Sequence, residues 1–256
     1  MTAPRDPGMQ ASAPRFHVAA IELRAGSDIA LPDAVAHHAT RVLRLGAGDA
    51  LTLFDGHGGE YAARLSQVDR RGARAAIERF VAIEREAPVV VTLAPSVLAA
   101  DAMDVALRKA VELGVARIEP VVATRSQGGA HGAQAQRRIA HWRQVVTGAC
   151  EQCGRNRVPP LADAVPLDIW LAGAGAADIV LVPGAPHTLL QRVADTPARA
   201  IVVGPEGGFT EDELAIARHH GLRAAALGAA VLRADTAAIA ALAVVQALAG
   251  AATRKA

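Results

Sequence analysis

The sequence predicts an α/β protein in which a small β-barrel precedes a larger domain built on a parallel sheet. Residues 15–86 consist of short alternating segments separated by Gly and Asp turns, which is typical of a small barrel. From residue 88 onward, aliphatic runs alternate with helical periods, which indicates parallel strands joined by crossover helices. We therefore expect an unstructured lead-in at 1–14, a barrel at 15–86 and an α/β domain at 88–254.

The barrel region contains one predicted helix, at 33–45. Asp33 is placed to cap its first turn and Gly46 to end it. His37 and His38 are adjacent, so they point in different directions on a helix and are expected on its surface, not on a metal. The strands expected around this helix are 15–23, 28–32, 50–68, which has a hairpin tip at 55–59, and 73–83.

The second region predicts five strand and helix pairs in succession. They are 89–94 with 101–114, 115–122 with 134–153, 178–184 with 187–195, 200–208 with 211–220, and 222–228 with 234–250. The glycine-rich stretch 173–178 precedes a strand and opens no helix. We therefore interpret it as a linker, not as a dinucleotide loop.

Composition favours a cytoplasmic protein without a membrane span. The chain is 52% hydrophobic, yet no apolar run approaches the roughly 20 residues that cross a bilayer, and the opening "MTAPRDPGMQASAPR" lacks the apolar core of a secretory signal. The net charge of +2 does not by itself indicate a nucleic-acid partner. Arginine nevertheless clusters at 64–85 and 137–157, which suits phosphate binding, with a solvated surface as the alternative.

Two cysteines, Cys150 and Cys153, form a C-x-x-C pair. There is no second such pair, and His131 and His141 lack the spacing of a zinc finger, so no metal is expected. A redox motif opens a helix after a strand, whereas this pair closes a helical pattern. We expect reduced, structural cysteines.

Loops at the carboxyl ends of the predicted strands are the candidate ligand site, because open parallel sheets bind ligands there. Three of them stand out, at 181–184, 203–209 and 227–237. The glycines of "VGPEGGF" either permit a positive φ or let the backbone approach a ligand, and the stretch alone does not separate the two. No Gly-Lys-Ser/Thr follows it, which disfavours a triphosphate.

Several motifs together resemble the ribosomal small-subunit methyltransferase E family. They are "HHATRVLRLGAGDALTLFDG", "RKAVELGV", "ACEQCGRNRVPPL", "VGPEGGFTEDEL" and "LGAAVLRADTAAI", and they extend over nearly the whole chain. This family belongs to the SPOUT superfamily and methylates N3 of a uridine in 16S rRNA. The resemblance implies a SPOUT-type trefoil-knotted parallel sheet domain, a rare exception to the rule against knots, and an N-terminal PUA-like barrel.

The resemblance also implies S-adenosylmethionine (SAM) as cofactor, a homodimer, and 16S rRNA as partner, within the small ribosomal subunit. The implied cofactor-binding residues are Leu181, Pro183, Gly204, Pro205, Glu206, Gly207, Gly208, Leu227, Gly228, Val231, Leu232 and Arg233. The implied RNA-binding residues are Arg15, Arg41, Arg44, Arg74, Arg125, Arg155, Asn156 and Arg157.

Methylation at N3 requires loss of a proton and leaves charge on the uracil carbonyls. We expect Arg233 to stabilise that charge, with Glu206 and Asp235 as nearby carboxylates; a structural salt bridge among them is the alternative.

The chain departs from the family pattern at two places. Asp235 stands where the Leu-Arg-x-Glu-Thr pattern has glutamate, and the lead-in "VLAADAMD" has no lysine. Two other functions therefore stay open, namely a SPOUT methyltransferase acting on another RNA such as tRNA, and a noncatalytic RNA-binding module on the same fold.

Overall fold

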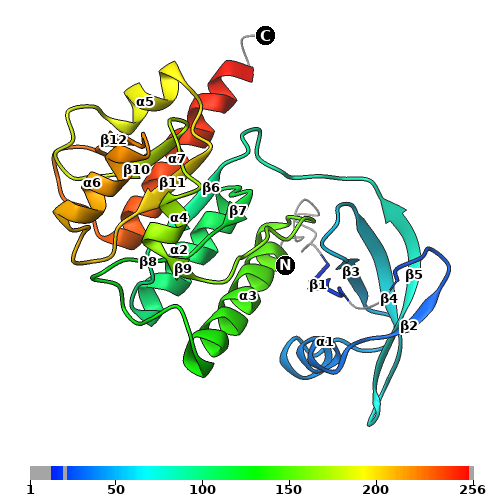
Figure 1. The fold of residues 1–256 in the computed structure, drawn as a ribbon. Coiled ribbons are helices and arrows are strands. Elements are labelled where there is room, and N and C mark those ends of the chain that lie inside the picture. Colours follow the sequence, from blue (N-terminus) through cyan, green and yellow to red (C-terminus); the bar gives the residue numbers. More distant parts are fainter. Residues whose placement is uncertain (1–12, 20–21, 254–256) are drawn as a thin grey trace, which may run out of the picture. The chain divides into compact units, whose positions relative to one another are not determined.

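The computed structural model describes residues 13–19 and 22–253, without the side chains of residue 195 and residues 249–253. Most of the expected lead-in lies outside the described residues. The chain forms two compact units, shown in Figure 1. Unit 1 comprises Met1–Arg85 and Gly154–Arg157, and unit 2 comprises Glu86–Cys153 and Val158–Ala256. The four residues Gly154–Arg157 were expected in the α/β domain and instead group with unit 1.

Unit 1 contains a five-stranded sheet with the order β1-β3-β4-β5-β2. The strands are β1 Arg15–His17, β2 Asp28–Ala30, β3 Ala50–Phe54, β4 Glu60–Asp69 and β5 Gly72–Val81. β1 pairs with β3 in parallel, and the other neighbours are antiparallel. The β4–β5 hairpin carries two register shifts, and such irregularities bend a strand pair.

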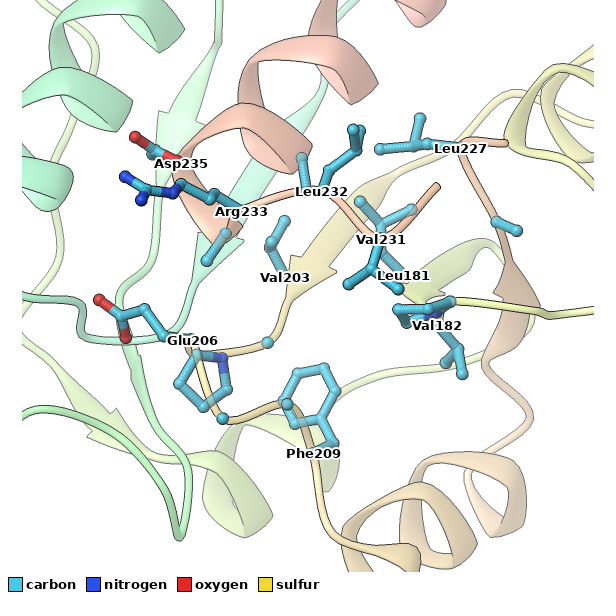
Figure 2. A pocket seen from close by; sticks show the side chains of 18 of the residues that line it. Leu181, Val182, Val203, Glu206, Phe209, Leu227, Val231, Leu232, Arg233 and Asp235 are labelled. Carbon is cyan, nitrogen blue, oxygen red and sulfur yellow. The ribbon is translucent and has the colours of Figure 1, made fainter. Parts of the chain in front are cut away.

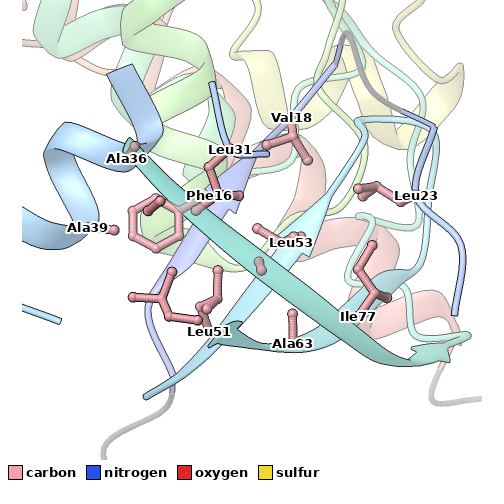
Figure 3. Packing of buried hydrophobic residues seen from close by; sticks show 13 residues of the cluster. Phe16, Val18, Leu23, Leu31, Ala36, Ala39, Leu51, Leu53, Ala63 and Ile77 are labelled. Atoms are coloured by element: carbon pink, nitrogen blue, oxygen red, sulfur yellow. The ribbon is translucent and has the colours of Figure 1, made fainter. Parts of the chain in front are cut away.

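The core of unit 1 follows from the period-two alternation of its strands. Leu51 and Leu53 of β3 are completely or almost completely buried, as is Ile77 of β5, and Figure 3 shows them gathered on one side of the sheet. Phe16 of β1 packs in the same cluster. Burying a side chain of this size stabilises the fold by roughly 1.5–3 kcal/mol.

The predicted helix at 33–45 ends differently from the expectation. It consists of α1 Asp33–His37 followed by a π-helical turn, η1 His38–Val42. Arg44, with φ of 59°, takes the left-handed position that we had predicted for Gly46. Asp33 does not cap the helix by a side-chain hydrogen bond; it occupies the first turn, where its charge complements the helix dipole. His37 and His38 are exposed.

Unit 2 is built on a sheet with the order β12-β10-β11-β6-β7, in which every neighbouring pair is parallel. Its strands are β6 Thr92–Pro95, β7 Arg117–Ile118, β10 Asp178–Leu181, β11 Ala200–Val203 and β12 Arg223–Ala225. β8 Val121–Val122 and β9 Val165–Pro166 form a separate parallel pair. All residues of β10 and β11 are buried, as expected for a sheet covered on both faces. The α/β class is confirmed, and the knot stays a prediction.

Helices cover this sheet. They are α2 Ala100–Glu112, α3 Ala133–Cys153, α4 Leu167–Leu171, α5 Leu189–Asp195, α6 Glu211–His219 and α7 Ala234–Thr253. α4 and α6 pack over Val180 of β10 and Val202 of β11. Because side chains alternate along a strand, Ile179 and Ile201 face the opposite side, and α7 contacts β11. The short α4 had not been predicted. No helix in the described part of the chain is long and apolar enough to cross a membrane.

Cys150 and Cys153 lie near the end of α3 and form no disulfide. Cys150 is buried and Cys153 is partly exposed, as expected for reduced, structural cysteines. The linker at 173–178 ends in Asp178, which is completely buried and forms an ion pair with Arg199. The hydrogen bond from Arg199 to Asp178 raises the pKa of the guanidinium although partial burial opposes this.

Glu213 fastens the start of α6 to a distant part of unit 2. Its Oε2 accepts a hydrogen bond from the backbone N–H of Thr210 and its Oε1 one from the backbone N–H of Thr124, each at 2.7 Å. Thr210 Oγ1 accepts in return from the Glu213 N–H, which completes a capping box. Burial alone would raise the pKa of Glu213, but the hydrogen bonds from Thr124 and Thr210 outweigh it and lower the pKa.

We predict that Glu213→Gln lowers the free energy of unfolding of unit 2 at pH 7 by about 1 kcal/mol, as for loss of a helix cap. The folded pKa of Glu213 is depressed, so its stabilisation is present above the ordinary value of 4.5 and is lost as the pH falls through the folded value. The difference in unfolding free energy between wild type and variant should therefore become smaller below pH 4.5. Urea unfolding followed by tryptophan fluorescence measures it, because Trp142 and Trp170 both lie in unit 2.

The matched control is Glu211→Gln on the same first turn, which removes an exposed charge without a hydrogen bond or ion pair among the described residues. Its effect should stay small and reflect the helix dipole alone. If the loss of unfolding free energy in Glu213→Gln did not depend on pH, the role of the ionised carboxylate would be contradicted.

Candidate functional site

A cavity of about 1050 Å³ lies at the carboxyl edge of the unit 2 sheet. Its walls come from the segments that follow β6, β10, β11 and β12, because strands that run in parallel end at the same edge. All predicted cofactor-binding residues line it, and so does Asp235. They are Leu181, Pro183, Gly204, Pro205, Glu206, Gly207, Gly208, Leu227, Gly228, Val231, Leu232, Arg233 and Asp235. The geometry thus brings the three predicted loops together, while their role in binding stays a prediction.

The lining has two chemically different sides, which Figure 2 shows. On one side, Leu181, Val231 and Leu227 present aliphatic side chains. On the other side, the charged groups of Arg233 and Asp235 lie near each other. Such a cavity offers an apolar surface to a flat ring and charged groups to a polar reaction centre.

The glycines of the loop after β11 differ in what the chain itself requires of them. Gly208 has φ of +71°, a backbone conformation that other residues adopt only with strain. A Cβ at Gly204 would lie 3.2 Å from the ring of Phe209, and a Cβ at Gly207 would lie 3.1 Å from Cδ of Arg125. The structural explanation, which the sequence left open, therefore applies to Gly208, while at Gly204 and Gly207 a side chain could meet its neighbours after a small shift and a ligand contact stays a prediction.

Two side chains from other segments fix the backbone of this loop. Arg125 Nη1 donates a hydrogen bond of 2.7 Å to the carbonyl of Gly207. Glu206 Oε1 accepts one of 3.0 Å from the backbone N–H of Ala99, immediately before α2. Arg125 had been predicted to bind RNA and Glu206 to serve as a carboxylate at the reaction centre. The structure gives both a place in holding the loop.

Arg233 and Asp235 do not form the salt bridge that was the alternative to a catalytic role. In the described part of the chain, the Arg233 guanidinium makes no hydrogen bond or ion pair, and the residue is exposed just before α7. Asp235 Oδ1 accepts a hydrogen bond of 2.7 Å from the backbone N–H of Thr236. The guanidinium is therefore available to a ligand.

The first turns of α2 were missed by sequence reasoning. They contribute Asp101, Ala102 and Val105 to the cavity wall, and Ala99 just before the helix adds to it. The signal was present, since the strand predicted at 89–94 belongs to the same parallel sheet and must end at the same edge. Beyond the predicted loops, Glu211 and Leu214 also line the cavity, as does Phe209 at the end of the predicted loop 203–209.

Burial contradicts the predicted RNA contact for Arg155 and Asn156. The two residues are 4% and 0% exposed. Asn156 Nδ2 donates to the carbonyl of Ile83 at 2.8 Å, and its Oδ1 accepts from Arg15 Nη2 at 2.6 Å. Arg15 is also committed, through an ion pair of 2.5 Å with Glu60. Buried polar groups need such partners, so these residues stabilise unit 1 and do not present themselves to RNA.

The remaining predicted RNA-binding residues of unit 1 are exposed, but not equally free. Arg74 forms an ion pair of 2.9 Å with Asp28, and Arg157 lies 3.3 Å from Glu84. Arg41 and Arg44 make no side-chain hydrogen bond or ion pair with any described residue. No group of three or more His, Cys, Asp or Glu side chains that could hold a metal ion occurs among the residues that the structure describes.

Family models match both units of the chain. A model described as an RNA methyltransferase domain matches residues 85–246, and one described as an RNA methyltransferase PUA domain matches residues 31–78. Ribosomal RNA small subunit methyltransferase E from Synechocystis sp. is 30% identical over 227 residues, which are 86% of this chain and 73% of the relative. The protein of the same name from Mycobacterium bovis is 32% identical over 212 residues, 80% of each chain.

Solved structures agree with these matches. A ribosomal RNA small subunit methyltransferase E from Neisseria gonorrhoeae, bound to S-adenosyl methionine, has a TM-score of 0.84 at 35% identity and covers 92% of this chain and 98% of its own. A putative methyltransferase from Legionella pneumophila with bound SAM has a TM-score of 0.86 at 33% identity and the same coverage. The predicted PUA-like and methyltransferase character of the fold is confirmed. The chain belongs to the ribosomal RNA small subunit methyltransferase E family of RNA methyltransferases.

Proposed function

We propose that this protein transfers a methyl group from SAM to N3 of a uridine in the 16S rRNA of the small ribosomal subunit. The observation that carries the proposal is the cavity at the carboxyl edge of the sheet, where an apolar side adjoins a charged side. The names of the relatives support ribosomal RNA as substrate. The solved neighbours with bound SAM support the cofactor.

The lining fits SAM and leaves room for a second substrate. Its volume of about 1050 Å³ lies at the upper end of the range for small-molecule sites. Leu181, Leu227 and Leu232 provide the apolar surface that an adenine ring requires, and the exposed backbone of the loop after β11 provides polar groups. When bound, SAM supplies a methyl group on a sulfonium that is already a strong donor. The protein therefore has mainly to align the acceptor nitrogen and manage its proton.

Arg233 is the residue that we assign to stabilise charge. Loss of the N3 proton places negative charge on the uracil carbonyl oxygens, and a guanidinium in the cavity wall that is unpaired among the described residues lowers the energy of that state. Glu206 and Asp235 each use one oxygen for a backbone N–H, at Ala99 and Thr236, which leaves a second oxygen for the proton. A carboxylate at 235 serves here although the family pattern has the longer glutamate.

Unit 1 brings the RNA to this centre, since its family model is that of an RNA methyltransferase PUA domain. The proposal includes a homodimer, as the resemblance implies, and no metal ion. Because the substrate is ribosomal RNA, we place the reaction in the cytoplasm.

We predict that the purified protein binds SAM with the same affinity in the presence and absence of a chelator. Isothermal titration calorimetry measures this directly. Leu232→Arg should weaken binding about tenfold or more, because it places a cation on the apolar side of the cavity. Ile169→Arg, at a residue 62% exposed on α4 and away from the cavity, is the matched control. Binding that disappears with the chelator would refute the metal-free site.

The reaction itself is tested on ribosomal RNA from a strain that lacks the protein. Mass spectrometry of 16S rRNA should find one methyluridine missing, and the wild-type protein should restore it at N3. A missing methyl group in tRNA instead would establish another RNA as substrate. No missing methyl group in any RNA, with SAM binding intact, would favour a noncatalytic module.

For Arg233→Ala we predict a fall in the single-turnover rate of roughly a hundredfold or more, as for loss of a preorganised donor, with SAM affinity nearly unchanged. Arg218→Ala removes an arginine of α6 that does not line the cavity and should leave the rate unaltered. Methylation by Arg233→Ala at the wild-type rate would remove Arg233 from the reaction centre.

A further inference from the structure

The turn that follows α1 has an unusual backbone. We call Arg41, Val42, Leu43 and Arg44 the 41–44 turn. The N–H of Leu43 donates to the carbonyl of His38 at 3.0 Å, which is a π-helical bond. Arg44 then takes φ of 59°, the one positive φ at a residue other than glycine in the described part of the chain. π-helical turns and left-handed non-glycine residues cost energy and concentrate at functional sites.

The residues on either side of the 41–44 turn are fixed by packing and hydrogen bonds. Ala36 and Ala39 are buried in the core of unit 1, at 4% and 0% exposure. The hydroxyl of Thr40 donates to the carbonyl of Ala36 at 2.8 Å, and the N–H of Leu45 donates to the carbonyl of Ala39 at 2.9 Å. The side chains of the turn are therefore presented on a fixed support.

Those side chains combine exposed apolar groups with uncommitted charges. Val42 is 59% and Leu43 is 43% exposed. They lie between Arg41 and Arg44, whose side chains make no hydrogen bond or ion pair in the described part of the chain. Other arginines of unit 1 do form ion pairs, for example Arg64 with Glu78 at 2.8 Å and Arg74 with Asp28 at 2.9 Å.

This combination fits unpaired nucleotides of RNA. Unstacked bases offer apolar faces, and aliphatic side chains act as wedges between bases in other nucleic-acid complexes. The phosphates on either side offer the charge that exposed guanidinium groups bind. A continuous duplex hides the base faces, so it satisfies the arginines but not the two aliphatic side chains.

We propose that the 41–44 turn docks on unpaired nucleotides of the RNA substrate, with Val42 and Leu43 against base faces and Arg41 and Arg44 on the adjoining phosphates. The proposal rests on the proposed function only in taking RNA as the partner. It adds that the N-terminal unit selects single-stranded structure before the cavity receives a base.

The experiment compares two probes, a synthetic RNA hairpin with an unpaired loop and an RNA duplex of the same length. Fluorescence anisotropy measures the dissociation constant at several salt concentrations. Val42→Ser with Leu43→Ser should weaken hairpin binding about tenfold or more, leave duplex binding unchanged and keep the salt slope, because no charge is altered. Val68→Ser, at a residue 38% exposed on β4, is the matched apolar control.

A second variant tests the charges and preserves the backbone. Arg41→Gln with Arg44→Gly removes both guanidinium groups, and glycine adopts the φ of 59° without strain. We expect the salt slope to fall in magnitude by about 0.7 for each lost phosphate contact. Circular dichroism and SAM binding verify that each variant is folded.

Three outcomes overturn the proposal. The serine variant could bind the hairpin with unchanged affinity, or it could lose equal affinity for hairpin and duplex. It could also show an altered oligomeric state in sedimentation with RNA binding intact, which would make the turn a protein contact. In each of them, wild-type methylation of 16S rRNA would still stand, so failure of this inference is distinguishable from failure of the proposed function.

Discussion

The parallel arrangement of the strands in unit 2 is the constraint on which the candidate site depends. β11 lies between β10 and β6, and β12 flanks β10, so segments far apart in the sequence end at one edge. In the observed register Val180 and Val202 face α4 and α6, and a shift by one residue would turn them to the other side of the sheet. The cavity is a consequence of this sheet and not of any one loop.

Within that frame, side chains compensate for backbone groups that the loops leave without partners. Glu206 accepts from Ala99, Arg125 donates to Gly207, and Glu213 accepts from both Thr124 and Thr210. Charged groups thus fix the cavity wall by hydrogen bonds to neutral backbone, while Arg233 keeps its guanidinium uncommitted among the described residues. This division separates residues that shape the cavity from Arg233, whose guanidinium is free to meet a ligand in it.

The sequence was sufficient where the determining pattern is local. Aliphatic runs, glycine loops and helical periods predicted the strands and the three loops that meet at the cavity. The roles of the arginines depended on distant partners, and a pattern could not show them: Arg15 meets Asn156 across 141 positions of the sequence. The end of the first helix was also misjudged, because Gly46 was the expected terminator and Arg44 takes the strained conformation instead. The contribution of α2 to the cavity wall could also have been predicted, because the strand expected at 89–94 belongs to the same parallel sheet and ends at the same edge.

The membership of Gly154–Arg157 in unit 1 has a consequence for how the chain folds during synthesis. Asn156 supplies the hydrogen-bond partners of Ile83 and of Arg15, so the first 85 residues emerge from the ribosome with part of their buried polar network missing. That network closes only after α3 has been translated, a contact of long sequence separation that slows folding. Domains usually fold in order from the N-terminus, but here the first unit is completed by four residues that are translated after α3.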